Sequence, residues 1–200
     1  MGGEIRVNSY QNNWQRNSHA TPFADGSFLV VWDSYFNEYE DGSPTLTYVA
    51  GQRFRADGTR IGSEFVIDGF DGCSSEEARV TTLRDGGFVV VWMFDDEDDI
   101  LTVNNEIWAR VYNADGSARS GRIRVDSALA SEDAVLPDVA ARGDGGFQVT
   151  WGNDGAPGIE FYNIRTRAFD AQGRAQGPDT LLNTAIRDFD QTHARTCTLR

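Results

Sequence analysis

Acidic side chains gather in two loops, each shortly after a tryptophan. They are Asp95, Asp96, Asp98 and Asp99 in one loop, and Glu38, Glu40 and Asp41 in the other. Calcium takes about six to eight oxygen ligands from carboxylates and carbonyls in flexible loops. These residues are therefore the candidate metal ligands, and calcium is the candidate cofactor. Their spacing fits no EF-hand and differs between the two loops, and a solvated acidic surface is the competing interpretation.

Aromatic residues in loops and linkers are the candidates for ligand contact. They are Trp14, Tyr35, Tyr39, Phe94, Phe161 and Tyr162. Binding pockets combine aromatic walls with a few polar groups, and several of these rings neighbour carboxylates in the sequence. A sugar is the ligand that this combination suggests. The competing interpretation is that the rings only cover the ends of a sheet.

Motifs of the common enzyme classes are absent from the sequence. It contains no Gly-x-Ser-x-Gly elbow, no His-Glu-x-x-His and no phosphate-binding loop. A sialidase Asp-box is absent as well, because Trp92 lies seven residues after Asp85. Carboxylate pairs that could serve a glycosidase are plentiful, but their abundance makes any chosen pair unspecific.

A stretch of eight residues that occurs three times positions these loops. It reads Asp-Gly-Gly-Phe-x-Val-x-Trp, with Ser in one copy, and it covers residues 25–32, 85–92 and 144–151. A second motif with an Ala-Asp-Gly or Ala-Gln-Gly turn follows each copy. A step of 60 and then 59 residues between the tryptophans indicates stacked supersecondary units. Asp-Gly between apolar runs predicts tight turns, so each unit consists of hairpins.

The strand after the second Asp-Gly turn is predicted to be buried on both faces, whereas in the third copy Gln148 and Thr150 make the second face wetter. In the second copy Phe88, Val90 and Trp92 point to one side, and Val89 and Val91 point to the other. The repeated tryptophans and phenylalanines are therefore expected in the core and not on a sugar-binding surface.

We expect one all-β domain over residues 1–200: a β-propeller-like array of three four-stranded repeats plus an orphan strand at each end. A β-sandwich or a linear β-stack is the alternative. The repeats are expected at about 9–68, 69–126 and 127–184, with 1–8 as the closing strand of a preceding repeat and 185–200 as the opening of a fourth. Unpaired end strands favour self-association through their edges.

The net charge of −13 argues against nucleic acid and anionic membranes as partners. No apolar run is long enough for a membrane helix, and no signal peptide is visible. Cys73 and Cys197 are too few for a disulfide framework, and unpaired thiols are expected.

The repeat pattern, carried by residues 139–151 and 52–67, resembles the tandem repeats of large secreted bacterial proteins of the RTX-like, hemolysin-type calcium-binding and adhesin group. The resemblance implies a secreted or cell-surface bacterial protein and supports calcium as its cofactor. The calcium-binding nonapeptide Gly-Gly-x-Gly-x-Asp of that group does not occur here.

Two functions are compatible with these observations. The main expectation is a non-catalytic extracellular module for adhesion, display or carbohydrate contact, with a surface glycan or a protein as its partner, and not an enzyme. The alternative is a glycoside hydrolase that acts on polysaccharide with carboxylates at the mouth of the propeller. A hydrolase should bring two carboxylates from different repeats into one pocket, about 5 to 10 Å apart.

Overall fold

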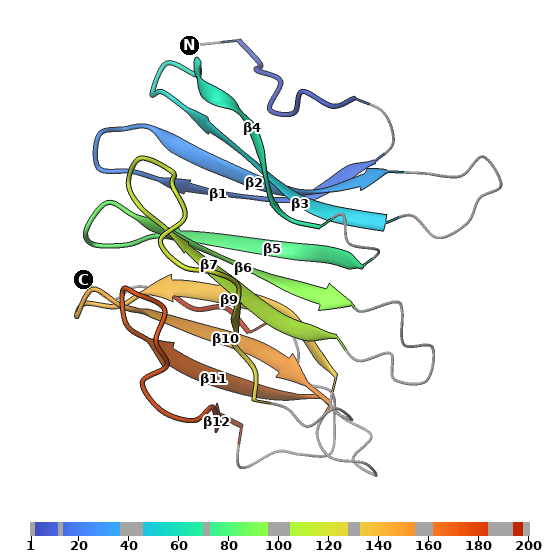
Figure 1. The fold of residues 1–200 in the computed structure, drawn as a ribbon, viewed down its shortest axis with the longest axis vertical. Helices are drawn as coiled ribbons and strands as arrows, with labels where there is room; N and C mark the ends of the chain where they lie inside the picture. Colours follow the sequence, from blue (N-terminus) through green and yellow to red (C-terminus); the bar gives the residue numbers. More distant parts are fainter. Residues whose placement is uncertain are drawn as a thin grey trace, which may run out of the picture.

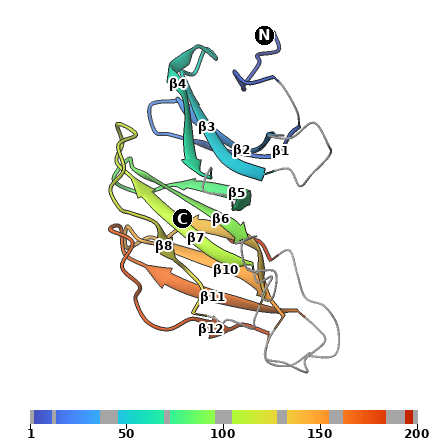
Figure 2. The ribbon, with the colours of Figure 1, turned by 45° about the vertical axis from the view of Figure 1, so that its right-hand side comes forward.

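The computed structural model describes residues 3–11, 14–36, 46–69, 73–95, 105–127, 133–154, 162–183 and 194–197. Within these ranges all regular structure is β, and no helix is long and apolar enough to cross a membrane. The strands form three four-stranded antiparallel sheets, each a simple meander. Figures 1 and 2 show the sheets stacked face to face along the long axis of the molecule. The expectation of an all-β, propeller-like array of three four-stranded repeats is confirmed.

The strands follow the repeats in order. The first sheet contains β1 (Gln15–Pro22), β2 (Phe28–Phe36), β3 (Leu46–Phe54) and β4 (Arg60–Asp68). The second contains β5 (Ser74–Thr82), β6 (Phe88–Asp95), β7 (Glu106–Tyr112) and β8 (Ile123–Arg124). The third contains β9 (Ala134–Ala141), β10 (Phe147–Asn153), β11 (Asn163–Phe169) and β12 (Thr180–Leu181). The first strands of the sheets, β1, β5 and β9, pack against one another.

The Asp-Gly turns between the first two strands of each sheet are built as the sequence predicts. The Asp85 carboxylate accepts a hydrogen bond from the Gly87 amide at 3.0 Å, and Asp144 accepts one from Gly146 at 3.1 Å. The intervening Gly86 has a φ of 86°, which glycine adopts without steric cost. These aspartates fix the turns and hence the register of the strands that follow.

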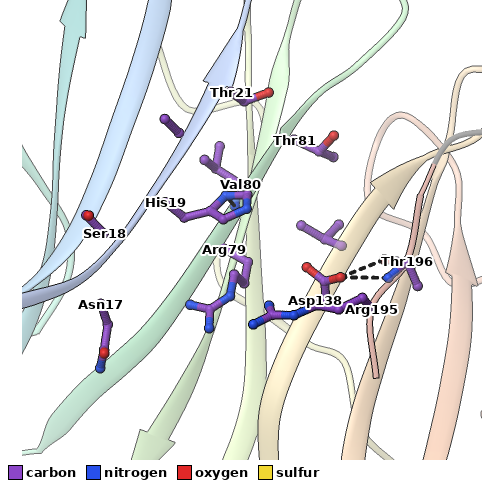
Figure 3. Close-up of a pocket in the computed structure, with 12 residues that line it drawn as sticks. Asn17, Ser18, His19, Thr21, Arg79, Val80, Thr81, Asp138, Arg195 and Thr196 are labelled. Atoms are coloured by element: carbon purple, nitrogen blue, oxygen red, sulfur yellow. Dashed lines mark hydrogen bonds between the residues drawn. The ribbon is translucent and has the colours of Figure 1, made fainter. Parts of the chain in front are cut away.

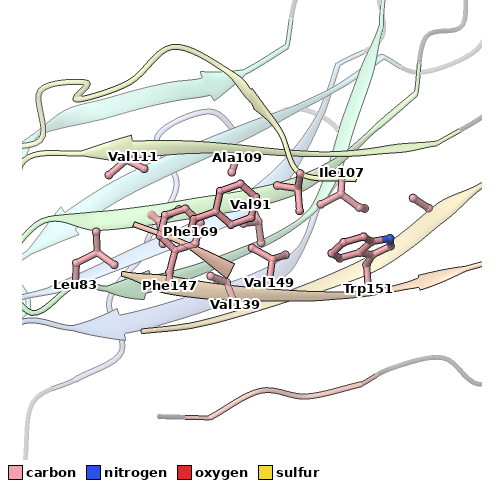
Figure 4. Close-up of a cluster of buried hydrophobic side chains, with 13 residues drawn as sticks. Leu83, Val91, Ile107, Ala109, Val111, Val139, Phe147, Val149, Trp151 and Phe169 are labelled. Atoms are coloured by element: carbon pink, nitrogen blue, oxygen red, sulfur yellow. The ribbon is translucent and has the colours of Figure 1, made fainter. Parts of the chain in front are cut away.

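The core lies between the sheets, and the second strand of the middle sheet serves both sides. Val89 and Val91 belong to the cluster that packs on the third sheet around Phe147 and Trp151, which Figure 4 shows. Phe88 and Trp92 belong to the cluster that packs on the first sheet. All of these side chains are inaccessible to solvent. The prediction of a strand buried on both faces is therefore confirmed, and so is the core position of the repeated tryptophans.

The described residues at the two ends bind through side chains and form no strand ladder. Arg60 donates hydrogen bonds to the carbonyls of residues 6–8, and Val7 packs on the apolar face of the first sheet. Near the other end, the amide of Thr196 donates to Asp138 on β9 at 2.7 Å. Cys73 and Cys197 are not joined by a disulfide.

Gly146 is required by close packing and gives a test of the fold. A Cβ atom there would lie 2.1 Å from the carbonyl oxygen of Phe169 on β11. We expect Gly146→Ala to lower the free energy of unfolding by roughly 1–3 kcal/mol, because backbone must move to admit the methyl group. Urea unfolding followed by tryptophan fluorescence measures this change.

Gly143→Ala is the matched control, three residues earlier at the same turn. A Cβ atom at Gly143 has nothing within 4 Å. Its free energy of unfolding should stay within about 0.5 kcal/mol of the unchanged protein. Equal stability of the two variants would contradict the packing described here.

Candidate functional site

The innermost strands β1, β5 and β9 share a distortion at equivalent points of the repeat. Asn17, Glu77 and Leu136 have φ values of 53°, 57° and 54°, and they are the non-glycine residues with positive φ in the described chain. The pairing register of each strand shifts at this point. Bulges of this kind redirect side chains and are frequent next to active sites. Left-handed backbone at a non-glycine residue also costs stability, so the surroundings must hold it in place.

A buried carboxylate on β2 holds the bulge of β5. Asp33 is inaccessible to solvent and accepts hydrogen bonds from the Glu77 amide at 3.0 Å and from the Asn17 side chain at 2.8 Å. Asn17 also donates to the Glu77 carboxylate at 3.0 Å. Burial raises the pKa of Asp33 to about 6, although these hydrogen bonds favour the charged form. Asp33 thus connects the bulges of the first and second sheets.

A cavity of about 530 Å³ lies beside the first residues of β1, β5 and β9, and we call it the mouth cavity. Three carboxylates line it, from Glu76 and Glu77 on β5 and from Asp133 just before β9. Glu77 accepts hydrogen bonds from Asn17 and, at 3.2 Å, from Arg79. The Glu77 side chain is 21% exposed to solvent, so its carboxylate is accessible from the cavity.

Asp133 lies on the side of the mouth cavity formed by the third sheet. Its oxygens accept hydrogen bonds from the amide of Asn105 at 2.8 Å and from the hydroxyl of Tyr162 at 3.0 Å. Glu77 and Asp133 therefore reach one cavity from different sheets. A pair of carboxylates that flanks a sugar can act as proton donor and as nucleophile or base in glycoside hydrolysis.

A second cavity of about 450 Å³ continues along the inner strands, and we call it the deep cavity. Asn17 lines both cavities. His19, Arg79, Asp138 and Arg195, which occupy equivalent positions of successive repeats, line the deep cavity, as Figure 3 shows. Burial, reinforced by the charge of Arg79, lowers the pKa of His19 below its ordinary value, so the imidazole is neutral near pH 7.

Two of the predicted ligand-contact residues lie at the mouth cavity. Tyr162 lines it, and Tyr35 donates a hydrogen bond from its hydroxyl to Glu76 at 3.0 Å. The exposed ring of Trp14 lies beside Tyr35, with the ring centres 6.2 Å apart. Phe94 lies elsewhere, packed edge-on against the ring of Trp108. Tyr39 and Phe161 lie outside the described residues.

One predicted calcium ligand falls on a described residue. Asp95 is the last residue of β6 and pairs with Ser74 on β5. The other candidates, Asp96, Asp98, Asp99, Glu38, Glu40 and Asp41, lie outside the described residues. Within the described ranges no group of three or more histidine, cysteine or carboxylate side chains could hold a metal ion. Calcium binding stays a prediction.

Six charged residues that line the two cavities were not among the residues predicted from the sequence. They are Glu76, Glu77, Asp133, Arg79, Asp138 and Arg195. A signal was present in the repeats, since His19, Arg79, Asp138 and Arg195 fall at one aligned position. Charged or polar residues recurring at one position of an inner strand mark a shared channel, and alignment of the first strands of the repeats would have found most of the set.

Solved structures with a similar fold act on glycosides. The Hadza microbial sialidase Hz136 matches with a TM-score of 0.59 and 12% identity, over 84% of this chain and 37% of that chain. A thermostable family-43 glycoside hydrolase matches with a TM-score of 0.54 and 13% identity, over 82% of this chain and 53% of that chain. The exo-β-1,3-galactanase 1,3Gal43A from Clostridium thermocellum matches with a TM-score of 0.53 and 12% identity, over 89% of this chain and 39% of that chain. No family model and no curated protein matches the chain.

These comparisons correct the main functional expectation. Proteins that share the fold are glycoside hydrolases, so the expectation of a non-catalytic module that is not an enzyme is contradicted, and the hydrolase alternative has the better support. At identities of 13% or less the likeness shows the fold. The chain spans about 37–53% of the length of these structures.

The buried Asp33 gives a pH-dependent prediction. Below about pH 4 this carboxyl is protonated in both the folded and the unfolded chain. As the pH rises toward 6, the unfolded chain releases the proton while the folded chain retains it, because burial raises the pKa of Asp33 to about 6. Asp33 should therefore lower the free energy of unfolding by roughly 3 kcal/mol as the pH rises from 4 to above 6.

Asp33→Asn should remove this fall, as measured by urea unfolding at a series of pH values. Asp57→Asn is the control, because Asp57 lies on an exposed turn and hydrogen bonds from Thr59 lower its pKa. The control should keep the fall between pH 4 and 6. An unchanged pH profile in Asp33→Asn would show that Asp33 is ionised without cost in the folded chain.

Proposed function

We propose that this domain hydrolyses glycosidic bonds at the mouth cavity. The observation that carries the proposal is that Glu77 and Asp133, from different sheets, line one solvent-accessible cavity. Glycoside hydrolysis needs one carboxyl group on each side of the scissile bond, and Glu77 and Asp133 are the candidates for this pair. The glycoside-acting proteins that share the fold add support.

Glu77 is the candidate nucleophile or general base. Asn17 and Arg79 donate hydrogen bonds to its two oxygens, which fixes the direction in which the carboxylate faces. The bulge that sets its backbone is held in turn by Asp33. A carboxylate held in this way loses little freedom when it meets the anomeric carbon or an attacking water, which is the benefit of preorganisation.

Asp133 is the complementary carboxylate on the opposite side of the cavity. The hydroxyl of Tyr162, an aromatic residue that lines the cavity, donates to it. The exposed ring of Trp14 lies beside the buried Tyr35, whose hydroxyl donates to Glu76 at the cavity. Such rings suit the apolar faces of sugars, so the predicted carbohydrate contact enters the proposal as substrate binding.

We also propose, from the sequence, that the protein is secreted and that calcium orders its repeats. The acidic loops and the resemblance to secreted bacterial repeat proteins support both. Self-association through the chain ends is likewise proposed and rests on the edges of the array.

The test is hydrolysis of a panel of nitrophenyl glycosides and polysaccharides by the full chain. Glu77→Gln should lower kcat by about 10²–10⁴-fold with an unchanged thermal midpoint, because it keeps the shape of the side chain and removes its acid–base capacity. Asp133→Asn should reduce kcat in the same range. Turnover is followed by nitrophenolate absorbance or by reducing ends.

Glu64→Gln is the matched control, since Glu64 lies on the outer strand β4 and accepts a hydrogen bond from the amide of Ser9. It should retain the rate of the unchanged protein. Full activity in Glu77→Gln, or no hydrolysis of any glycoside in the panel by the unchanged chain, would contradict the proposal.

A further inference from the structure

The deep cavity carries an arrangement of charge that the fold does not require. Arg79 and Arg195 line it together with the imidazole of His19, and Asp138 is the carboxylate among its described lining residues. In Figure 3 both guanidinium groups extend into the space between β5 and β9. Arg79 is paired with Glu77 at 3.2 Å, and an anion bound in the cavity would attract both guanidinium groups.

The carboxylate of Asp138 is already engaged. Its Oδ2 accepts hydrogen bonds from the amide of Thr196 at 2.7 Å and from the Thr196 hydroxyl at 3.3 Å. Asp138 therefore holds the segment 194–197 against β9 and, through it, positions Arg195. No hydrogen bond or ion pair of the Arg195 guanidinium to another described residue is present, so its donors are available to a ligand.

His19 adds a neutral donor. Its Nδ1 accepts a hydrogen bond from the amide of Val80 at 3.3 Å. Because the ring is neutral, this bond leaves the hydrogen on Nε2, and an imidazole N–H becomes available. Arg79, whose side chain is 12% exposed, donates to the Ala78 carbonyl and to Glu77, and so joins the deep cavity to the mouth cavity.

From this arrangement we infer that the deep cavity is an anion site that receives the carboxylate of an acidic sugar, with Arg195 and Arg79 as its main donors. Guanidinium groups match carboxylates through paired, charge-assisted hydrogen bonds. Asn17 lines both cavities, and in this proposal the carboxylate of a uronic acid occupies the deep cavity while its anomeric carbon faces Glu77. The inference rests on the proposed function for the reaction, and the anion site itself is tested by binding alone.

The acidic character of the chain does not oppose such a ligand. The net charge of −13 is spread over the whole molecule, and at physiological salt charges beyond about 8 Å are largely screened. The groups that line the cavity therefore decide the binding of a single carboxylate.

The experiment measures binding of D-glucuronate, D-glucose and inorganic phosphate to the full chain by titration calorimetry at pH 7. Glucuronate should bind at least about tenfold more tightly than glucose, because a single charge-assisted hydrogen bond strengthens binding by about that factor or more. Arg195→Gln should weaken glucuronate binding about tenfold and leave glucose unaffected. Arg195→Lys keeps the charge and loses the paired donors, so its affinity for glucuronate should lie between those of the unchanged chain and Arg195→Gln.

Arg174→Gln is the matched control, because Arg174 is exposed in the turn before β12 and does not line the cavity. It should bind glucuronate like the unchanged chain. Equal affinities in Arg195→Gln and Arg174→Gln, or equal binding of glucuronate and glucose, would overturn the inference. Phosphate that binds more tightly than glucuronate would overturn the assignment to an acidic sugar.

Binding and turnover separate this inference from the proposed function. Asp133→Asn should retain glucuronate binding while it loses hydrolysis, because Asp133 lines the mouth cavity and does not line the deep cavity. If the unchanged chain cleaves no glycoside and yet binds glucuronate through Arg195, the hydrolase proposal fails and the anion site stands. If it cleaves neutral glycosides and shows no preference for glucuronate, the anion site fails and the hydrolase proposal stands.

Discussion

The second strand of each sheet is the constraint on which the structure depends. In the middle sheet Phe88 and Trp92 bury one face of this strand while Val89 and Val91 bury the other. Exposing either face to water would cost about 1.5–3 kcal/mol of folding free energy for each large side chain, so a sheet must lie on both sides. Stacking the sheets in this way brings β1, β5 and β9 together, and both cavities lie along these inner strands.

The inner strands are regular at the Asp-Gly turns and distorted at the opposite end. The bulges at Asn17, Glu77 and Leu136 fall at the same point of each repeat, yet their neighbours differ. Asp33 on β2 accepts a hydrogen bond from the bulged amide of Glu77, and this buried acid belongs to the first sheet alone. The repeat therefore supplies a common frame, and individual substitutions within it supply the chemistry, as is usual for function carried on a shared fold.

The sequence predicted the architecture because its signals are local. Asp-Gly turns and apolar alternation specify hairpins within a few residues, and their recurrence specifies the stack. The site depends on contacts between repeats, such as Asn17 with Glu77, which lie 60 residues apart. Attention to the densest acidic loops also led away from Glu77, which follows Glu76 in a strand whose bulge is not visible in the sequence. Ligand contact by Tyr35 and Tyr162 stays a prediction: Tyr162 lines the mouth cavity, whereas Tyr35 is a buried residue of β2. The shared cavity of Glu77 and Asp133 is visible only in three dimensions.

The central claim is that ligands meet the chain at the bulges of its inner strands. The most direct measurement is an NMR titration of the isotope-labelled full chain with a mixture of short oligosaccharides, followed through backbone amide shifts. The account predicts that the largest shifts occur at and beside Asn17, Glu77 and Leu136, with little change on β4, β8 and β12. Shifts confined to those outer strands, or to the Asp-Gly turns at the far end, would contradict it.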